Sequence, residues 1–246
     1  MLSLSYLSKA ITAILIGIPA FFMVFFEDLP TPSFLPVLLI LVLAAPTLIN
    51  FIESQNRYKA LAVYLLFTII AISIELIGVR TGFPYGNFHY SDLLPLKVAG
   101  EVPVTLSLTF VPLLIGAFAI SQKISNNKLT RIILTTVFLL LADLVLDPGA
   151  VHVNLWTFEQ NGFYYNVPFS NYLGWIFSGL IFSVLCAIFL NEVNFNYKKI
   201  TFTYEATIWY WTIACLSAGL VIPVIVGLSL LIYLEFSRNS NLCVKF

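Results

Sequence analysis

Residues 75–103 read ELIGVRTGFPYGNFHYSDLLPLKVAGEVP and interrupt a chain that is otherwise mostly apolar. A second polar stretch, residues 143–175, reads DLVLDPGAVHVNLWTFEQNGFYYNVPFSNYLGW. The rest of the chain consists mainly of long apolar runs. Because an apolar run of about 20 residues can cross the hydrocarbon core of a bilayer as a helix, the polar breaks between these runs determine the fold.

The composition is that of a membrane protein. Of the 246 residues, 60% are hydrophobic and only 10% are charged, and the mean hydropathy is +0.96. These values are far from those of a soluble globular domain. The twelve basic and twelve acidic residues balance, so no basic surface for nucleic acid is expected. We predict a single integral membrane domain covering residues 1–246, in contact with membrane lipid.

Seven apolar runs have about the length of a membrane-spanning helix. They lie at about residues 10–26, 34–52, 60–79, 102–120, 131–146, 172–190 and 208–234. The predicted fold class is therefore all-α, a polytopic membrane helix bundle with about seven transmembrane helices. The last run contains Pro223, which in a membrane helix more often causes a kink than an end. A break there would change the number of helices.

The positions of lysine and arginine predict the orientation, because cytoplasmic loops retain these residues. If the chain forms seven helices, eight of the twelve lysine and arginine residues fall on the side of the N-terminus. The other four, Arg80, Lys97, Arg238 and Lys245, fall on the opposite side. We therefore expect a multi-pass protein of the cell membrane with a cytoplasmic N-terminus and an external C-terminus. Both polar stretches would then lie on the external side and form one site.

Three acidic residues are expected at similar depth at that end of the bundle. Glu75 lies about one turn before the end of the third predicted helix, and Asp143 and Asp147 lie at the end of the fifth. Residues four apart share a helix face, but Pro148 disfavours helical geometry at Asp147, so we expect the helix to end there. Carboxyl groups at the edge of the hydrocarbon are costly and usually face the bundle interior, which makes them functional candidates. The alternative for Asp143 or Glu75 alone is an ion pair with Arg80 or a loop cap.

The second stretch alternates aromatic rings with Asn, Gly and Pro after Asp147. This pattern is typical of a structured loop, or of an interfacial helix lying over the mouth of the bundle. Any single ring also fits the aromatic belt at a membrane interface. The rings concerned are Trp156, Tyr164, Tyr165, Tyr172 and Trp175.

The remaining residue types limit the chemistry. The chain has no glycine-rich phosphate loop after a strand, and its two histidines, His89 and His152, form no metal-binding set with cysteine. We therefore expect no nucleotide, flavin or metal cofactor. Carboxyl groups and aromatic rings at a lipid-accessible site remain. Desolvation favours the neutral form of a carboxyl group, and aromatic faces stabilise cations. This combination indicates proton-initiated chemistry on an isoprenoid double bond.

At these residues the sequence resembles the integral-membrane carotenoid 1,2-hydratases. The resemblance covers roughly the middle half of the chain, and Phe158 and Asn154 depart from the family pattern, where Trp and Gly are more usual. The matching motifs are Glu75-x-x-Gly78, Thr81-Gly82-x-Pro84-Tyr85-Gly86-x-Phe88-x-Tyr90, Gly100-x-Val102-Pro103, Asp143-x-x-x-Asp147-Pro148, Trp156 and Gly162-x-Tyr164-Tyr165-x-Val167-Pro168-x-x-Asn171-x-x-Gly174-Trp175.

The resemblance implies addition of water across the terminal C1=C2 double bond of an acyclic carotenoid end, giving a tertiary alcohol without a cofactor. Our hypothesis is that Asp143 or Asp147 protonates C2, and that Glu75 orients the attacking water. Nearby rings would stabilise the cation at C1. Association with other carotenoid biosynthesis enzymes is a further expectation. The predicted substrate-binding residues are Tyr85, His89, Tyr90, Trp156, Tyr164, Tyr165, Asn171 and Trp175.

Two other functions fit the same residues. An integral-membrane lycopene cyclase begins with a similar protonation but quenches the cation internally, so its product keeps the mass of the substrate. A small transporter or receptor would use the intramembrane acids to bind a cation and would leave carotenoids unchanged.

Overall fold

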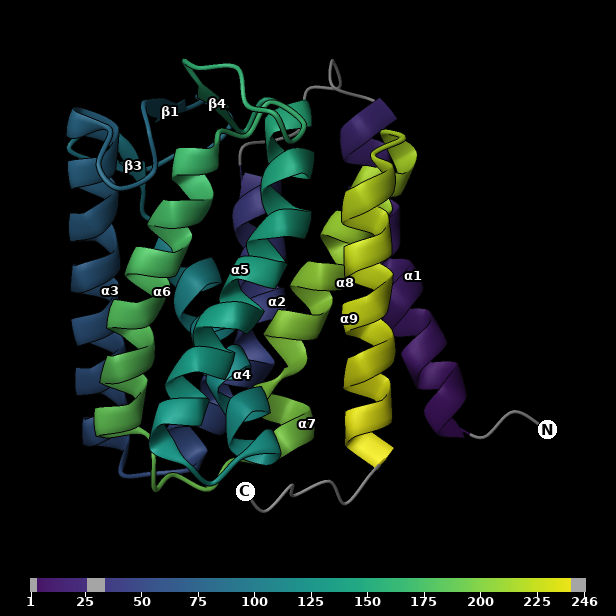
Figure 1. The fold of residues 1–246 in the computed structure, drawn as a ribbon. Helices are drawn as coiled ribbons and strands as arrows, with labels where there is room; N and C mark the ends of the chain where they lie inside the picture. The colour runs from purple at the N-terminus through teal and green to yellow at the C-terminus, as the bar shows by residue number, and fades with distance from the viewer. Residues whose placement is uncertain (1–3, 26–33, 240–246) are drawn as a thin grey trace.

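Helices make up most of the structure, a computed structural model in which residues 4–25 and 34–239 are described (Figure 1). The helices are α1 Leu4–Phe25, α2 Phe34–Glu53, α3 Arg57–Thr81, α4 Leu106–Ile124, α5 Lys128–His152, α6 Phe169–Phe189, α7 Tyr197–Ile200, α8 Phe202–Ser217 and α9 Val221–Asn239. Short strands lie in the connections: β1 Phe88–Tyr90, β2 Lys97–Val98, β3 Val102–Pro103 and β4 Trp156–Phe158. The predicted all-α bundle is confirmed.

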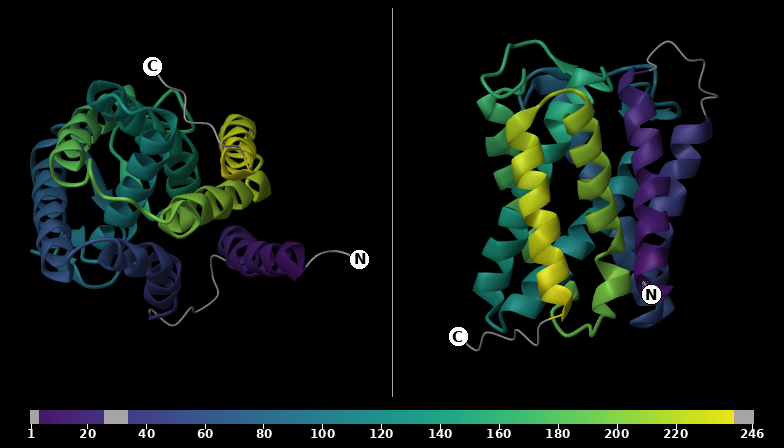
Figure 2. Two further views of the ribbon diagram at one scale, coloured as in Figure 1. Left: turned by 90° about the horizontal axis from the view of Figure 1, so that it is seen from below. Right: turned by 90° about the vertical axis from the view of Figure 1, so that its right-hand side faces the viewer.

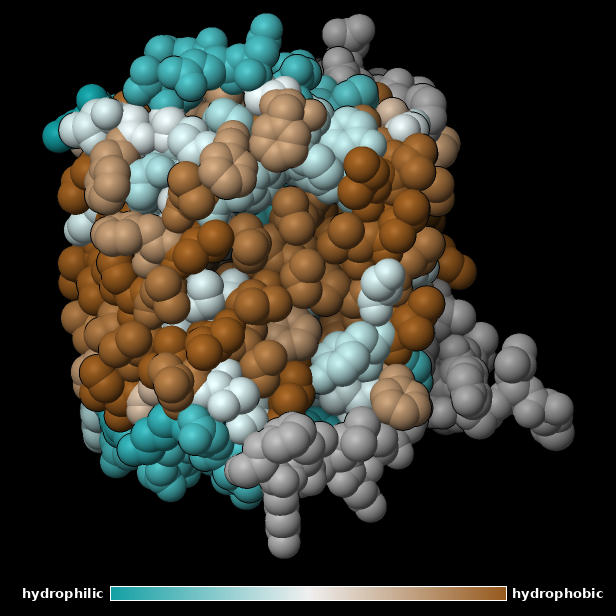
Figure 3. All heavy atoms as spheres, viewed as in Figure 1, coloured by the Kyte–Doolittle hydropathy of each residue, from teal (hydrophilic) through white to brown (hydrophobic). Residues whose placement is uncertain are grey.

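Five helices are long and apolar enough to cross a membrane, namely α3, α4, α5, α6 and α9. Within the described side chains, α1 and α2 carry shorter apolar stretches, Thr12–Val24 and Val37–Glu53, and α8 has 16 residues. Hydrophobic side chains form a band between two more polar ends on the face shown in Figure 3. The chain is therefore a multi-pass membrane protein, whereas the predicted number of seven spans is not confirmed.

The prediction of one helix over residues 208–234 is wrong, because this run folds into a hairpin of α8 and α9. The turn contains Gly219, whose φ of 72° lies in the left-handed region that favours glycine. The N–H of Leu220 donates to the carbonyl oxygen of Cys215 at 2.8 Å and closes the last turn of α8. Pro223 lies in the first turn of α9, where a missing N–H breaks no helical hydrogen bond.

This hairpin returns the end of α9 to the side of the bundle where α1 begins (Figures 1 and 2). Nη1 of Arg238 lies there, 2.8 Å from Oε1 of Glu205 in the first turn of α8. The prediction that Arg238 lies opposite the N-terminus is therefore wrong, and Lys245 and the C-terminus lie outside the described residues. Nine basic positions share the end of the N-terminus, and two, Arg80 and Lys97, lie at the other end. The nine are Lys9, Arg57, Lys59, Lys123, Lys128, Arg131, Lys198, Lys199 and Arg238.

Helix α4 is the enclosed centre of the bundle. It contacts α2, α3, α5, α6, α7 and α8, and its side chains from Val111 to Ser121 are buried. Gly116 lets α8 approach closely, because a Cβ there would lie 2.9 Å from Cβ of Tyr204. The hydroxyl of Tyr204 donates to the carbonyl oxygen of Phe138 at 2.7 Å. In the view from below, α1 lies at the periphery, where it packs against α8 (Figure 2).

The two polar stretches meet at the end of the bundle opposite the N-terminus (Figure 1). β1 from the first stretch pairs antiparallel with β4 from the second, with Tyr90 opposite Trp156 and Phe88 opposite Phe158. β2 and β3 pair within the first stretch. The predicted association of the two stretches is therefore observed, and between α5 and α6 the chain forms β4 and a loop rather than an interfacial helix.

Candidate active site

Helix α5 continues through Pro148 to His152, so the prediction that it ends at Asp147 is wrong. Pro148 has no N–H to donate to the carbonyl of Leu144, four residues earlier. That carbonyl instead accepts a hydrogen bond from the hydroxyl of Tyr164 at 3.1 Å. Proline is tolerated in a membrane helix when a neighbouring group satisfies the freed carbonyl in this way. The helix therefore places Asp143 and Asp147 on one face, about one turn apart.

Asn171 of α6 joins these two carboxyl groups. Its Nδ2 lies 3.1 Å from Oδ2 of Asp143, and it also donates to Oδ2 of Asp147. Asp143 is 1% exposed, and Asp147 and Asn171 are each 3% exposed. One amide nitrogen thus holds two carboxyl groups close together in a nearly dry interior, an arrangement in which a carboxyl pair can share one proton.

Glu75 on α3 reaches the same end of the bundle. Its Oε2 accepts a hydrogen bond from the hydroxyl of Tyr90 at 2.9 Å, and its charge interacts with that of Asp147. Burial is the main cause that raises the pKa of Tyr90 well above its usual value, and the nearby Glu75 carboxylate raises it further. Tyr90 therefore remains a neutral donor. Arg80 pairs with Glu101 at 2.8 Å. The alternative ion pair between Arg80 and Glu75 is therefore not observed.

Tyr85 packs between α3 and α6 where both helices carry glycine. A Cβ on Gly174 would lie 2.8 Å from the carbonyl oxygen of Pro84 and closer still to the Tyr85 ring, and one on Gly78 would lie 3.1 Å from Cδ2 of that ring. Burial is the main cause that raises the pKa of Tyr85 well above its usual value. The carboxylate of Glu75 raises it further, and the two aspartates make smaller contributions. The glycines therefore admit a neutral tyrosine within electrostatic range of all three acids.

Two further predicted residues line this region through ring contacts. The ring of Trp156 lies edge-on to Tyr90, with centroids 5.9 Å apart. The ring of Tyr164 lies edge-on to Tyr172, with centroids 5.8 Å apart. Together with Asn171, Tyr85 and Tyr90, they surround the acids.

The remaining three predicted residues have no contact with the acids among the described residues, although the ring of Tyr165 lies edge-on to that of Tyr164, with centroids 5.0 Å apart. His89 is exposed, and its Nε2 lies 2.8 Å from Oγ1 of Thr157 on the neighbouring strand. The hydroxyl of Tyr165 accepts a hydrogen bond from the N–H of Ile222 at 3.3 Å, in the first turn of α9. The ring of Trp175 packs on Phe110 of α4, with centroids 6.0 Å apart. The structure does not bring these three together with the carboxyl groups.

Two buried polar atoms beside the aspartate pair have no hydrogen-bond partner among the described residues: Oδ1 of Asp143 and the hydroxyl of Tyr172. Tyr172 is 6% exposed and interacts electrostatically with Asp143 and Asp147. Buried polar groups are normally paired, so unpaired ones at a candidate site point to a bound water or ligand. The sequence prediction left Tyr172 out of the substrate-binding residues, because any single ring in this stretch also fits the interfacial aromatic belt. Its position next to Asn171 was the available signal.

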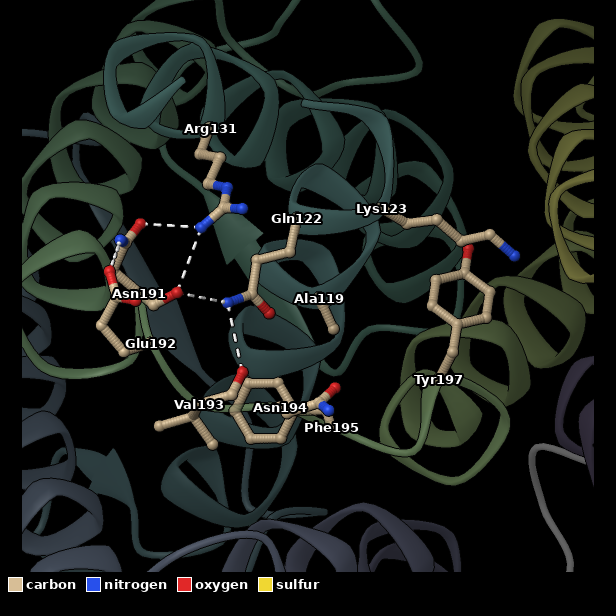
Figure 4. A pocket seen from close by; sticks show the side chains of 10 residues that line it. All are labelled: Ala119, Gln122, Lys123, Arg131, Asn191, Glu192, Val193, Asn194, Phe195 and Tyr197. Carbon is tan, nitrogen blue, oxygen red and sulfur yellow. Dashed lines mark hydrogen bonds between the residues drawn. The ribbon is translucent and has the colours of Figure 1, made fainter. Parts of the chain in front are cut away.

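A cavity of about 400 Å³ lies at the other end of the bundle (Figure 4). Two of its lining side chains hold the chain between α6 and α7. Nε2 of Gln122 donates to the carbonyl oxygens of Leu190 at 3.1 Å and Val193 at 3.4 Å, and Nη1 of Arg131 donates to Oδ1 of Asn191 at 2.8 Å. Because these polar groups are used to fix this connection, we place the candidate active site at the carboxyl groups.

The fold and the site together define a multi-pass α-helical membrane protein with a buried carboxyl pair at one end. The family described as carotenoid biosynthesis protein matches residues 34–234, and the chain belongs to this family. The chain is also similar to bisanhydrobacterioruberin hydratase of Haloarcula japonica, with 37% identity over 159 residues, which are 63% of this chain and 52% of the relative. It thus spans about half the length of that relative. No solved structure matches the chain.

Family membership confirms the resemblance that the motifs of the two polar stretches indicate, and it supports a role in carotenoid biosynthesis. The matched region includes α3, α5 and α6, the helices that carry Glu75, the aspartate pair and Asn171. The site described above therefore lies within the part of the chain that defines the family.

Proposed function

We propose that this protein is a carotenoid 1,2-hydratase, which adds water across the terminal C1=C2 double bond of an acyclic carotenoid end to give a tertiary alcohol. One observation carries the proposal: Asn171 holds two nearly dry carboxyl groups together at one end of a membrane bundle. The name of the Haloarcula japonica relative, a hydratase, supports the same class of reaction.

The carboxyl pair can supply both proton transfers that the reaction needs. A neutral carboxyl group of the Asp143–Asp147 pair gives its proton to C2, and the electrons of the double bond form the new C–H bond. The tertiary cation left at C1 is stabilised by aromatic faces such as those of Tyr90 and Trp156. A water oxygen then forms the C–O bond at C1, and one of its protons returns to the carboxylate. The net change is the addition of one water.

The substrate and the fold match in size and environment. The hydrocarbon core of a bilayer is about 30 Å thick, and an extended carotenoid has a similar length. Such a molecule can lie along the bundle with one end at the carboxyl pair, close to the polar loops and to water. Glu75, which Tyr90 holds at the same end, is suited to orient the attacking water.

We further propose that the carboxyl end of the bundle faces the outside of the cell membrane. The nine basic positions at the end of the N-terminus, against two at the carboxyl end, support this orientation. The altered position of α9 increases the asymmetry that the sequence alone predicts. Labelling of a single cysteine introduced at exposed Asp92 with a membrane-impermeant reagent in intact cells tests it, and protection of that cysteine until the cells are lysed contradicts it.

Expression in cells that make lycopene tests the proposed reaction. We expect carotenoids that have gained the mass of one or two waters, measured by mass spectrometry of the extracted pigments. A new cyclic product of unchanged mass identifies a cyclase instead. Unchanged pigments together with proton-dependent uptake of a cation identify a transporter.

A further inference from the structure

The geometry points to Tyr172 as a catalytic residue: its hydroxyl holds the water that captures the cation, next to Asp143 as the proton donor. This inference rests on the proposed hydratase function, and within that site it assigns the attacking water to Tyr172 in place of Glu75. It starts from the two buried polar atoms that lack a partner among the described residues, the Tyr172 hydroxyl and Oδ1 of Asp143.

The two aspartates are not equivalent in this arrangement. Asn171 engages Oδ2 of both carboxyl groups. Oδ1 of Asp143 is the oxygen of the pair that is buried without a partner in the described chain. No N–H or O–H of the described residues donates to this oxygen, so a proton on it can be given to a substrate carbon. We therefore assign Asp143 as the proton donor. Asp147 is the neighbouring carboxyl group, and Asn171 donates a hydrogen bond to both.

The position of Tyr172 is fixed by the same structure that accommodates Pro148. Its ring lies edge-on to Tyr164, with centroids 5.8 Å apart. The hydroxyl of Tyr164 is bound to the carbonyl oxygen of Leu144, the residue next to Asp143. Tyr172 is thus held against the segment of α5 that carries the proton donor, and with 6% exposure it is not a ring of the lipid-facing belt.

The hydroxyl groups of two other tyrosines, one buried and one half-buried, have partners. Tyr204 donates to the carbonyl oxygen of Phe138 at 2.7 Å, and Tyr210 lies 3.1 Å from Sδ of Met23. An unpaired buried hydroxyl destabilises the folded protein. Among the described tyrosines, Tyr172 is the one with a hydroxyl that is buried without a partner, and its location beside the carboxyl pair indicates a use in the reaction.

One water satisfies both unpaired atoms. It donates one hydrogen to the oxygen of Tyr172 and, once Asp143 has given its proton to C2, the other to Oδ1 of Asp143. Its lone pair is then free for C1. As the C–O bond forms, Oδ1 takes the second proton, so Asp143 recovers the proton that it gave and the substrate gains one water.

Removal of the Tyr172 hydroxyl should therefore separate the two halves of the reaction. In the variant Tyr172→Phe, Asp143 still protonates C2, but the cation lacks a positioned water and returns its proton. In heavy water this reversal places deuterium in the recovered carotenoid without forming an alcohol. The ring and its contact with Tyr164 remain, and only an unpaired oxygen is lost, so the variant should fold.

The test uses the purified full-length protein in lipid nanodiscs, with lycopene as the substrate in heavy water. We expect Tyr172→Phe to lower alcohol formation by about 10²-fold or more, while deuterium still enters the recovered lycopene. Asp143→Asn should lose both alcohol formation and deuterium entry. The control Tyr210→Phe, which removes a buried hydroxyl in α8, should match the unaltered protein in both measurements.

Two results would overturn the inference. One is an unchanged rate of alcohol formation in Tyr172→Phe, and the other is equal loss of alcohol formation and deuterium entry in a folded Tyr172→Phe protein. If deuterium still enters lycopene with Asp143→Asn, Asp143 is not the proton donor. If the unaltered protein forms no alcohol at all, the proposed function itself fails, which is a distinct outcome.

Discussion

Two clusters of polar side chains, one near each end of the helix bundle, use their polar atoms differently. Beside the cavity near the α6–α7 connection, Arg131 and Gln122 donate to neighbouring oxygens, and neither has a buried side-chain atom without a partner in the described structure. At the carboxyl end, the described residues leave Oδ1 of Asp143 and the Tyr172 hydroxyl unpaired.

This difference separates a structural polar cluster from a reactive one. Hydrogen bonds that use every buried donor stabilise the fold, whereas an unpaired buried group costs about 1–3 kcal/mol. A protein retains such a cost where the group serves another purpose, and active sites commonly do so. Substitutions at the carboxyl end should therefore change the reaction, and substitutions at the opposite end should change stability.

Among the substitutions that compare the two clusters, the largest effect is expected for Asp147→Asn. This substitution removes one carboxyl group of the pair and leaves an uncharged amide of similar size, so alcohol formation from lycopene should fall by about 10²–10⁴-fold. The amount of protein in the membrane should stay near normal. The measurement is alcohol formed per amount of folded protein, and Asp92→Asn in the exposed loop is the matched control. Full hydration by Asp147→Asn would contradict the role of the pair.

A pair of asparagine substitutions compares the two ends directly. Asn171→Leu removes the donor shared by the carboxyl groups, and because displacement of a catalytic group by about 1 Å can cost 10²-fold in rate, alcohol formation should fall by about that factor. Asn191→Leu removes an acceptor of Arg131 and should lower the free energy of unfolding by about 1–3 kcal/mol. The rate of alcohol formation per amount of folded protein and the thermal unfolding in detergent are measured for both variants. The same pattern of changes in both variants would contradict the difference between the two clusters.

Gly174→Ala tests how α6 accommodates the turn that carries Tyr85. The added Cβ would lie 2.8 Å from the carbonyl oxygen of Pro84, so the turn must move, at a cost of about 1–3 kcal/mol and with a lower rate of alcohol formation. Gly179→Ala is the control on the same helix, because its Cβ would lie 3.3 Å from Cγ2 of Thr136 and needs only a small adjustment. Equal unfolding temperatures for the two variants would argue against this tight packing.

The smallest effect concerns two buried tyrosines. Tyr204→Phe removes a hydroxyl that is bonded to the carbonyl oxygen of Phe138 and should lower the free energy of unfolding by about 1 kcal/mol. Tyr172→Phe removes an unpaired hydroxyl and should leave the stability unchanged or slightly raised. Denaturant titration of both variants measures the difference, and a larger loss of stability in Tyr172→Phe would mean that its hydroxyl is already paired.

The sequence predicts the class of fold because apolar runs of spanning length are an explicit signal. It does not predict the α8–α9 hairpin, since Gly219 interrupts an apolar run without adding polar residues, and only the left-handed conformation of that glycine reveals the turn. Likewise, Pro148 suggests a helix end, and the helix continues because Tyr164, distant in sequence, satisfies the carbonyl of Leu144.

The sequence predicts the acidic residues of the candidate site more fully than the aromatic residues around them. Asp143, Asp147 and Glu75 stand out because charges are rare in apolar runs, and their positions relative to helix ends indicate a common depth. Aromatic residues carry less information, because a ring near a membrane interface can face lipid, a strand or the site. His89 and Tyr172 illustrate this limit: the first is exposed on β1, and the second is buried beside the carboxyl pair.

The origin of the oxygen in the product tests the central claim most directly. Purified protein in lipid nanodiscs is given lycopene in water labelled with oxygen-18, and the pigment is analysed by mass spectrometry. We expect a tertiary alcohol that carries the labelled oxygen. The unaltered protein and Asn191→Leu should form it at equal rates per amount of folded protein, and Asp143→Asn should form none. A cyclic product of unchanged mass, or labelled alcohol formed at full rate by Asp143→Asn, would contradict it.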